Sequence, residues 1–246
     1  MADATRSPKA SAPERIDRIL THEILSGAYP PGSRLPTLRE LADSHQVNPS
    51  TMQRALARLE VRGLITARQG SGLLVNDPYT VADISLVSDW LHVTADDPDR
   101  AAAIVSDLLE LRRVLACCLI KKYRSEVLEA VASLASGAAE VAAANDDGVL
   151  AADMAFAHLL VRSTGNMAAA AVLNSLGRAL GEHPVLVEAM YLHPDENAAS
   201  MMEVLTAVQA GGPEMAVRVE EAVASVDART VANYRALLVE RQADSG

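Results

Sequence analysis

The chain has 246 residues, of which half are hydrophobic but only 3% are aromatic, and its formal net charge is −10. No apolar run reaches the roughly 20 residues that a membrane-spanning helix needs, and the first residues lack the apolar stretch of a secretory signal, so we expect a disordered tail over residues 1–11. The two cysteines, Cys117 and Cys118, are neighbours and cannot form a disulfide framework, which favours a reducing, cytoplasmic location.

The charge is divided unevenly along the chain. Residues 1–80 hold 10 Lys and Arg against 8 Asp and Glu, a net charge of +2, whereas residues 81–246 hold 12 against 24, a net charge of −12. This asymmetry indicates an anion-binding segment joined to a body with another role, although an acidic surface can also be a solvated face without function.

Residues 12–77 predict three short helices followed by a β-hairpin. The first helix is predicted by apolar residues at helical spacing: Ile16, Ile19, Leu20 and Ile24. Thr37 with Glu40 three residues later forms a capping box that starts a second helix, which ends near His45. Asn48 as N-cap and Pro49 as the first residue start a third helix that runs to about Arg62.

The third helix has the features of an element that reads DNA. Its buried face consists of four apolar residues: Met52, Ala55, Leu56 and Leu59. The opposite side is predicted to expose Ser50, Thr51, Gln53, Arg54 and Arg58. Such a helix fits the major groove, and hydroxyl, amide and guanidinium groups in its first turn can reach bases and phosphates. A hairpin follows, with its turn at "QGSG" (residues 69–72), and Arg68 at its base can meet a phosphate. The pattern predicts a winged helix-turn-helix.

The stretch "GAYPPGSRLPTLRELADSHQVNPSTMQRALARLEVRGLITARQGSGLLV" resembles the DNA-binding domain of the GntR family of bacterial transcription regulators. The resemblance implies that Arg39 contacts phosphate and that the wing glycine, Gly70, enters the minor groove. It also implies that four residues read bases: Asn48, Ser50, Thr51 and Gln53. The full set of residues that we assign to DNA contact is Arg34, Arg39, Asn48, Ser50, Thr51, Gln53, Arg54, Arg68, Gln69 and Gly70.

This stretch departs from the FadR subgroup of that family at two positions. Members usually carry arginine where this chain has Pro49, and often where it has Gln53. The two arginines would be the main bidentate partners for guanine, each contributing about 1–3 kcal/mol of discrimination. The usual operator of the subgroup therefore cannot be assumed for this chain.

Beyond a linker over residues 78–83, the pattern predicts an all-helical domain over residues 84–243. The expected helices cover Ile84–Val93, Arg100–Tyr123, Ser125–Ala144, Leu150–Ser163, Ala168–Leu180, Pro184–Tyr191, Asp195–Ala210, Pro213–Ser225 and Asp227–Gln242. The segments "DLLELRRVLACCLI" and "DMAFAHLLVRSTGN" resemble the all-helical effector domain of the FadR subgroup. The fold class is therefore mainly α, a winged helix-turn-helix followed by a helical bundle.

Many members of that subgroup bind a divalent metal through one Asp and three His. Asp153 matches the Asp, but the three His positions are Ala157, Met201 and Val223, so no metal ligand set is predicted. His158 lies one residue beyond the first His position and is either a surface residue or an indirect supporter of a site. We assign effector contacts to Arg112, Asp153, His158 and Asn166; for Arg112, an ion pair within the bundle, for example with Asp153, is an equal alternative.

These observations predict a homodimeric, ligand-responsive repressor that binds a two-fold DNA operator. The resemblance leaves the effector open between a small carboxylate metabolite held by Arg112 and an acyl-CoA. An architectural DNA-binding protein without an effector is an alternative, and so is an enzyme in the helical domain. No P-loop, HExxH motif or Cys/His cluster is present, and we expect no cofactor and no membrane partner.

Overall fold

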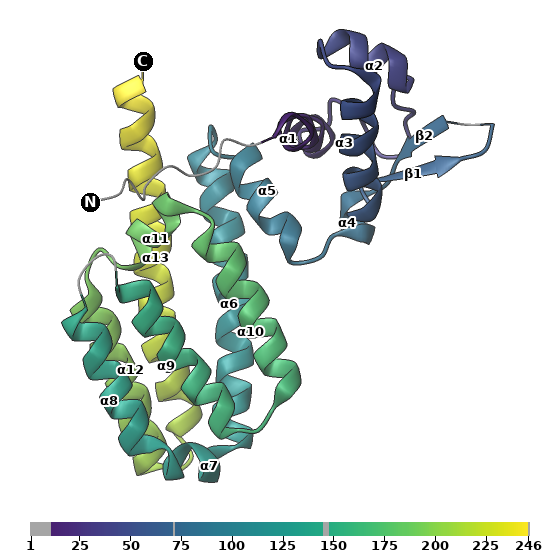
Figure 1. Cartoon of the computed structure of the whole chain (residues 1–246). Coiled ribbons are helices and arrows are strands. Elements are labelled where there is room, and N and C mark those ends of the chain that lie inside the picture. The colour runs from purple at the N-terminus through teal and green to yellow at the C-terminus, as the bar shows by residue number, and fades with distance from the viewer. Residues whose placement is uncertain (1–10, 71, 145–147, 246) are drawn as a thin grey trace, which may run out of the picture. The chain divides into compact units, whose positions relative to one another are not determined.

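The computed structural model describes residues 11–70, 72–144 and 148–245. The chain divides between Val93 and Thr94 into two compact units, which we call the N-terminal unit and the C-terminal unit and describe separately (Figure 1). Of the tail predicted over residues 1–11, residues 1–10 lie outside the described residues. Ser11 is described, and its backbone N–H donates to the Glu14 carboxylate at 2.9 Å at the start of the first helix. In the described part of the chain, no helix combines the length and apolar character that crossing a bilayer requires.

The N-terminal unit is a winged helix-turn-helix, as predicted. Its elements are α1 (Ala12–Leu25), α2 (Leu38–Ser44), α3 (Pro49–Val61), β1 (Ile65–Arg68), β2 (Gly72–Val75), α4 (Pro78–Val81) and α5 (Ser85–Val93). The two strands are antiparallel, with Ile65 paired to Val75 and Arg68 paired to Gly72. Helices α1 and α2 both pack against α3, and a buried cluster of aliphatic side chains joins all three to the hairpin (Figure 1).

Side-chain caps fix the starts of α2 and α3. Thr37 accepts from the backbone N–H of Glu40 at 3.3 Å, and the backbone N–H of Thr37 donates to the Glu40 carboxylate at 2.7 Å. The side-chain oxygen of Asn48 accepts from the backbone N–H of Thr51 at 2.8 Å. Both caps satisfy N–H groups that have no partner within the helix, so the turn between α2 and α3 is held by local bonds.

Helix α5 belongs to the N-terminal unit, whereas the sequence placed it in the effector domain from residue 84 onward. Leu86 is 1% exposed and joins the same buried cluster as the side chains of α1 and α3, and Trp90 packs against that cluster. The predicted linker over residues 78–83 also contains the short helix α4. The sequence pattern missed the boundary because apolar spacing shows that a helix is buried but not which core buries it.

The C-terminal unit is all-helical, as predicted. Its elements are α6 (Pro98–Lys122), α7 (Arg124–Glu129), α8 (Val131–Ala143), α9 (Val149–Ser163), α10 (Met167–Gly181), α11 (Pro184–Met190), α12 (Pro194–Ala210) and α13 (Met215–Ser245). Helix α13 packs along α6, α11 and α12, and α8 packs against both α9 and α12 (Figure 1). Side chains of six of these helices, α6 and α9–α13, line one cavity.

Two predicted helix boundaries in this unit were wrong. The helix expected over Ser125–Ala144 is divided at Ala130 into α7 and α8, although neither Gly nor Pro marks that position. Packing against α6, α8, α9 and α12 sets the direction of α7, and no local signal records it. The two helices expected over Pro213–Ser225 and Asp227–Gln242 are one helix, α13, because no Gly or Pro interrupts residues 214–245.

Candidate functional site

The N-terminal end of α3 presents the polar groups that the sequence assigned to base reading. Gln53 and Arg54 are exposed. Asn48 and Ser50 are exposed too, but they bond to each other, since the Ser50 hydroxyl donates to the Asn48 side-chain oxygen at 2.8 Å. Asn48 thus uses its oxygen for capping and keeps its amide N–H groups for an outside partner.

The expectation that Thr51 is exposed was wrong. Thr51 is 6% exposed, because it lies one helical turn before Ala55, which is fully buried. Its side chain therefore belongs to the packed face of α3, and Gln53 and Arg54 remain, with Asn48 and Ser50, as the exposed polar side chains at this end.

The arginines toward the end of α3 are engaged inside the unit. Arg58 lies 3.3 Å from Asp17 and 3.6 Å from Glu14, both on α1. Arg62 pairs with Asp89 on α5 and donates to the Thr21 hydroxyl at 3.1 Å. Burial raises the pKa of Asp89 above its ordinary value, and Arg62 offsets part of that increase. These pairs fasten α3 to α1 and α5.

Four other arginines of the predicted interface are exposed: Arg34, Arg39, Arg54 and Arg68. Within the part of the chain that the structure describes, none of them forms an ion pair. Arg39 lies in the first turn of α2, and Arg34 precedes that helix and forms a backbone bridge to Leu74 of β2. Exposed guanidinium groups without a carboxylate partner are the kind of group that binds phosphate.

The wing is held to α3 by residues that the sequence analysis did not single out. The Asn76 amide donates to the Gly63 carbonyl at 2.6 Å and to the Thr66 hydroxyl at 2.8 Å. The Glu60 carboxylate accepts from the backbone N–H of Ala67 at 3.3 Å. At the tip, Gln69 and Gly70 are exposed, and Gly70 has a φ of +75°, which favours glycine. An Asn directly after a predicted strand was the only sequence signal for this anchor.

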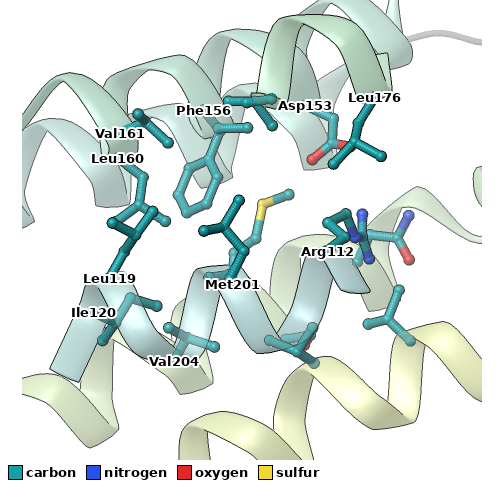
Figure 2. A pocket seen from close by; sticks show the side chains of 18 of the residues that line it. Arg112, Leu119, Ile120, Asp153, Phe156, Leu160, Val161, Leu176, Met201 and Val204 are labelled. Carbon is teal, nitrogen blue, oxygen red and sulfur yellow. The ribbon is translucent and has the colours of Figure 1, made fainter. Parts of the chain in front are cut away.

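The C-terminal unit contains a cavity of about 170 Å³. It is lined by side chains from six helices, α6 and α9–α13, and most of them are apolar. Figure 2 shows its two charged side chains, Arg112 and Asp153, near one end. Leu119, Leu160 and Val161 lie at the other end, and Phe156 and Met201 lie between the two ends.

Both charged side chains of the cavity already have partners within the unit. Arg112 donates to the Asp227 carboxylate at 2.7 Å, and Arg113 donates to its other oxygen at 2.9 Å. The Tyr191 hydroxyl donates to Asp153 at 2.5 Å. Burial, followed by the Asp153 carboxylate, raises the pKa of Tyr191, so the phenol remains a donor. Arg112 thus forms an ion pair within the bundle, with Asp227 and not with Asp153.

The four positions that the resemblance compared with a metal site all line this cavity. They are Asp153, Ala157, Met201 and Val223. Three of them carry no atom that a hard divalent cation prefers as a ligand. Among the described residues, no group of three or more His, Cys, Asp and Glu is placed to hold a metal ion. The lining does not fit a divalent metal.

Two of the residues assigned to the effector lie outside the cavity lining. His158 is exposed on α9, and its ring Nε2 lies 2.7 Å from the side-chain oxygen of Asn174. Asn166 caps α10 by accepting from the backbone N–H of Ala169 at 3.0 Å. One residue beyond Ala157, His158 is rotated by about 100° around the helix and therefore points away from the cavity. Arg112 and Asp153 are the assigned residues that line it.

The fold and these two sites are those of a DNA-binding transcription regulator with a separate effector-binding domain. Residues 13–75 match the bacterial regulatory proteins of the gntR family, and residues 107–225 match the FCD domain. The chain belongs to the GntR family, with a FadR-like helical domain, as the sequence predicted. The matched domains are those of transcription regulators, and no enzyme family is indicated.

Several known proteins are similar to this chain. The uncharacterized HTH-type transcriptional regulator Rv0494 of Mycobacterium tuberculosis is 31% identical over 225 residues, which cover 90% of each chain. The fatty acid metabolism regulator protein of Vibrio cholerae is 30% identical over 105 residues, which cover 42% of this chain and 37% of that protein. A solved structure of Lar, which controls the expression of the Listeria monocytogenes agr system, has a TM-score of 0.52 at 14% identity over 93% of this chain and 98% of that one, a similarity of fold alone.

Proposed function

We propose that this protein is a homodimeric repressor that binds a two-fold DNA operator and changes its affinity for that operator when the cavity of the C-terminal unit is filled. The division among the arginines of the N-terminal unit carries the proposal. Arg58 and Arg62 are used in ion pairs within the unit, whereas Arg34, Arg39, Arg54 and Arg68 are exposed without such pairs. An operator on the chromosome also implies a cytoplasmic location.

In this proposal, phosphate contacts and base contacts come from different residues. Arg39 on α2 and Arg68 on the wing bind phosphates and set the position of the protein on the duplex. Gln53, exposed on α3, reads a base edge, and the chain offers no arginine at that position or at Pro49. Glutamine pairs through two hydrogen bonds with adenine, so we expect adenine at the operator position that it meets.

An operator selected from random DNA tests this division. Arg39→Ala should weaken binding to the selected operator and to unrelated DNA alike, by roughly tenfold, since it removes a charge-assisted hydrogen bond to phosphate. Gln53→Ala should change the preferred base at one position of each half-site and leave binding to unrelated DNA unchanged. The measurement is fluorescence anisotropy with both DNAs.

Arg100→Ala is the matched control, because Arg100 is an exposed arginine of the C-terminal unit and its loss changes the net charge equally. Equal binding by Arg39→Ala and Arg100→Ala would refute the proposed docking of α2 on phosphate.

A stripe on α6 supports assembly as a dimer. Leu111 is 55% exposed and Val114 is 57% exposed, and Cys118 is exposed one turn further along the same face. Apolar side chains at helical spacing that face solvent indicate a surface that another chain covers. Two copies joined there would supply the two reading units that a two-fold operator needs.

Sedimentation at micromolar concentration tests this assembly. Val114→Glu should shift the protein from dimer toward monomer, because it places a carboxylate in an apolar interface. Val172→Glu, on the 44% exposed Val172 of α10, is the control and should leave the dimer unchanged. A monomeric parent protein would overturn the dimer proposal.

A further inference from the structure

The electrostatic state of the cavity limits what it can bind. Of its 21 lining residues, Arg112 and Asp153 are the charged ones, and each is already paired, with Asp227 and Tyr191 respectively. The guanidinium groups of Arg112 and Arg113 are matched by the carboxylates of Asp227 and Asp153. The charged end of the cavity therefore has no excess charge of either sign.

The other polar groups of the lining are also largely engaged. The Asn197 amide donates to the Met190 carbonyl at 2.8 Å, and the Ser200 hydroxyl donates to the Ala222 carbonyl at 2.7 Å. Thr230, 4% exposed, adds a hydroxyl that can both donate and accept. The cavity thus has a large apolar wall and three uncharged polar side chains, which belong to α12 and α13.

The volume sets the size of the ligand. The cavity measures about 170 Å³. An apolar protein cavity of about 150 Å³ lined by Leu, Ile and Phe holds one benzene molecule. This cavity is lined by the same kinds of side chain, among them Leu119, Ile120 and Phe156. It therefore fits a single ring or a short branched chain better than a long extended one.

We infer that the effector is a compact, uncharged and mainly apolar molecule of about the size of one substituted ring, with one hydrogen-bonding group directed to the end of the cavity that holds Arg112 and Asp153. This inference rests on the proposed role of the cavity as the effector site. It selects against both effector classes considered from the sequence, a small carboxylate and an acyl-CoA.

A charged ligand would meet charges that are already paired. A carboxylate bound by the remaining N–H groups of Arg112 would lie close to the carboxylate of Asp227, whose side chain is 6% exposed and already pairs with Arg112 and Arg113, so the two negative charges would repel each other. An ammonium group that approached the Asp153 carboxylate would lie near the guanidinium group of Arg112 at the same end of the cavity. Each charged ligand would also lose its hydration on entering an apolar cavity. A neutral ligand avoids these costs.

Three ligands of one size and different charge test the inference on the full-length protein. They are benzyl alcohol, benzoate and benzylamine, titrated by calorimetry at pH 7, with octanoate as a fatty-acid probe. Benzyl alcohol should bind about tenfold more tightly than each charged compound. Tighter binding of benzoate, benzylamine or octanoate than of benzyl alcohol, or binding of none of the four, would overturn the inference.

Two variants locate the binding and its charge preference. Ala157→Leu adds three carbon atoms to the cavity wall and should abolish binding of benzyl alcohol, whereas Ala155→Leu, at an exposed position of the same helix, should leave it intact. Asp227→Asn frees both guanidinium groups and should shift the preference toward benzoate. If Asp227→Asn does not fold, the comparison of Ala157→Leu with Ala155→Leu still decides: equal binding by these two variants would refute the site.

The same titrations, repeated with operator DNA present, separate the two proposals. Tight binding of benzyl alcohol without any change in DNA affinity would contradict the ligand-responsive regulation in the proposed function and leave the chemistry of the cavity standing. A change in DNA affinity caused by benzoate alone would support ligand-responsive regulation and contradict the inference that the effector is uncharged.

Discussion

The carboxylate of Asp227 determines the electrostatics around Arg112. The side chain is 6% exposed, and its carboxylate accepts from both Arg112 and Arg113, so one buried negative charge is shared by two positive charges of α6. Arg112 would otherwise present an unpaired guanidinium to the cavity. The chemistry of the cavity is thus decided by a residue outside its lining, on α13.

Tyr191 gives a prediction at the scale of one residue. Burial and Asp153 raise its pKa above the ordinary value of 10.0, so the stability from its hydrogen bond is fully present below about pH 10 and is lost as the pH rises above it. Tyr191→Phe should lower the free energy of unfolding at pH 7 by about 1–2 kcal/mol, because Asp153 loses its donor. The variant should also lose less stability between pH 9 and about pH 11 than the parent protein.

Urea unfolding at several pH values measures both effects. Tyr79→Phe is the control, since Tyr79 is 91% exposed. If Tyr191→Phe and Tyr79→Phe had the same stability at pH 7 and the same alkaline profile, the buried hydrogen bond would contribute nothing.

At the scale of residues, the sequence predicted which side chains carry a role better than it predicted the residues that they contact. Arg112 was assigned either a ligand or an ion pair, and its partner lies 115 residues away, where no local pattern records it. Thr51 was misplaced because a hydroxyl side chain in the first turn of a helix fits both a buried and an exposed position. Arg39, Gln53 and Gly70 lie on exposed positions, as expected, and their contacts with DNA stay predictions.

At the scale of elements, helix starts were predictable because their signals are local. Thr37 bonds with Glu40, and Asn48, which precedes Pro49, bonds with Thr51, so each cap spans three residues. The division at Ala130 depends instead on how α7 packs against four other helices. The placement of α5 depends on which core receives Leu86 and Trp90, and sequence periodicity carries no such information.

The end of α12 gives a prediction at this scale. Arg124 donates to the carbonyls of Val208 at 3.0 Å and Gln209 at 3.3 Å, so one side chain caps the end of the helix. Gly211 follows with φ 64° and ψ −149°, a region that is essentially restricted to glycine, and a Cβ there would lie 2.7 Å from the Arg124 guanidinium. Gly211→Ala should lower the free energy of unfolding by about 1–3 kcal/mol.

Gly137→Ala is the matched control for that change. Gly137 lies inside α8, and an added Cβ would meet Phe156 at 3.5 Å, an ordinary contact. Its replacement should leave stability unchanged or raise it by up to about 1 kcal/mol, since alanine favours the helix. Calorimetry on both variants tests the pair; equal melting temperatures would contradict the role given to Gly211.

At the scale of the whole molecule, the two units differ in charge. The N-terminal unit, residues 1–93, holds 10 Lys and Arg against 10 Asp and Glu, a net charge of 0, whereas residues 94–246 hold 12 against 22, a net charge of −10. The chain as a whole therefore repels DNA while its exposed arginines attract phosphate. Binding should therefore weaken steeply as salt is added, with log K falling linearly against log salt concentration.

Two arginines of the N-terminal unit should affect that salt dependence differently. Arg68→Ala should reduce the slope of log K against log salt concentration by about 0.9, the value for one phosphate contact. Arg58→Ala should leave the slope unchanged and lower the thermal stability, because Arg58 pairs with Asp17 inside the unit. Titrations of operator DNA between low and moderate salt measure the slopes. A reduced slope for Arg58→Ala would place that side chain on DNA.

The place of α5 has a consequence for exchanging parts between relatives. A chimera joined before Ile84, where the pattern of the sequence placed the boundary, would take Leu86 and Trp90 from a foreign chain and separate Arg62 from the aspartate that it pairs with. A chimera joined between Val93 and Thr94 would move the whole core of the first unit intact. A chimera that combines the N-terminal unit of this protein with the C-terminal unit of a relative should therefore be joined after α5.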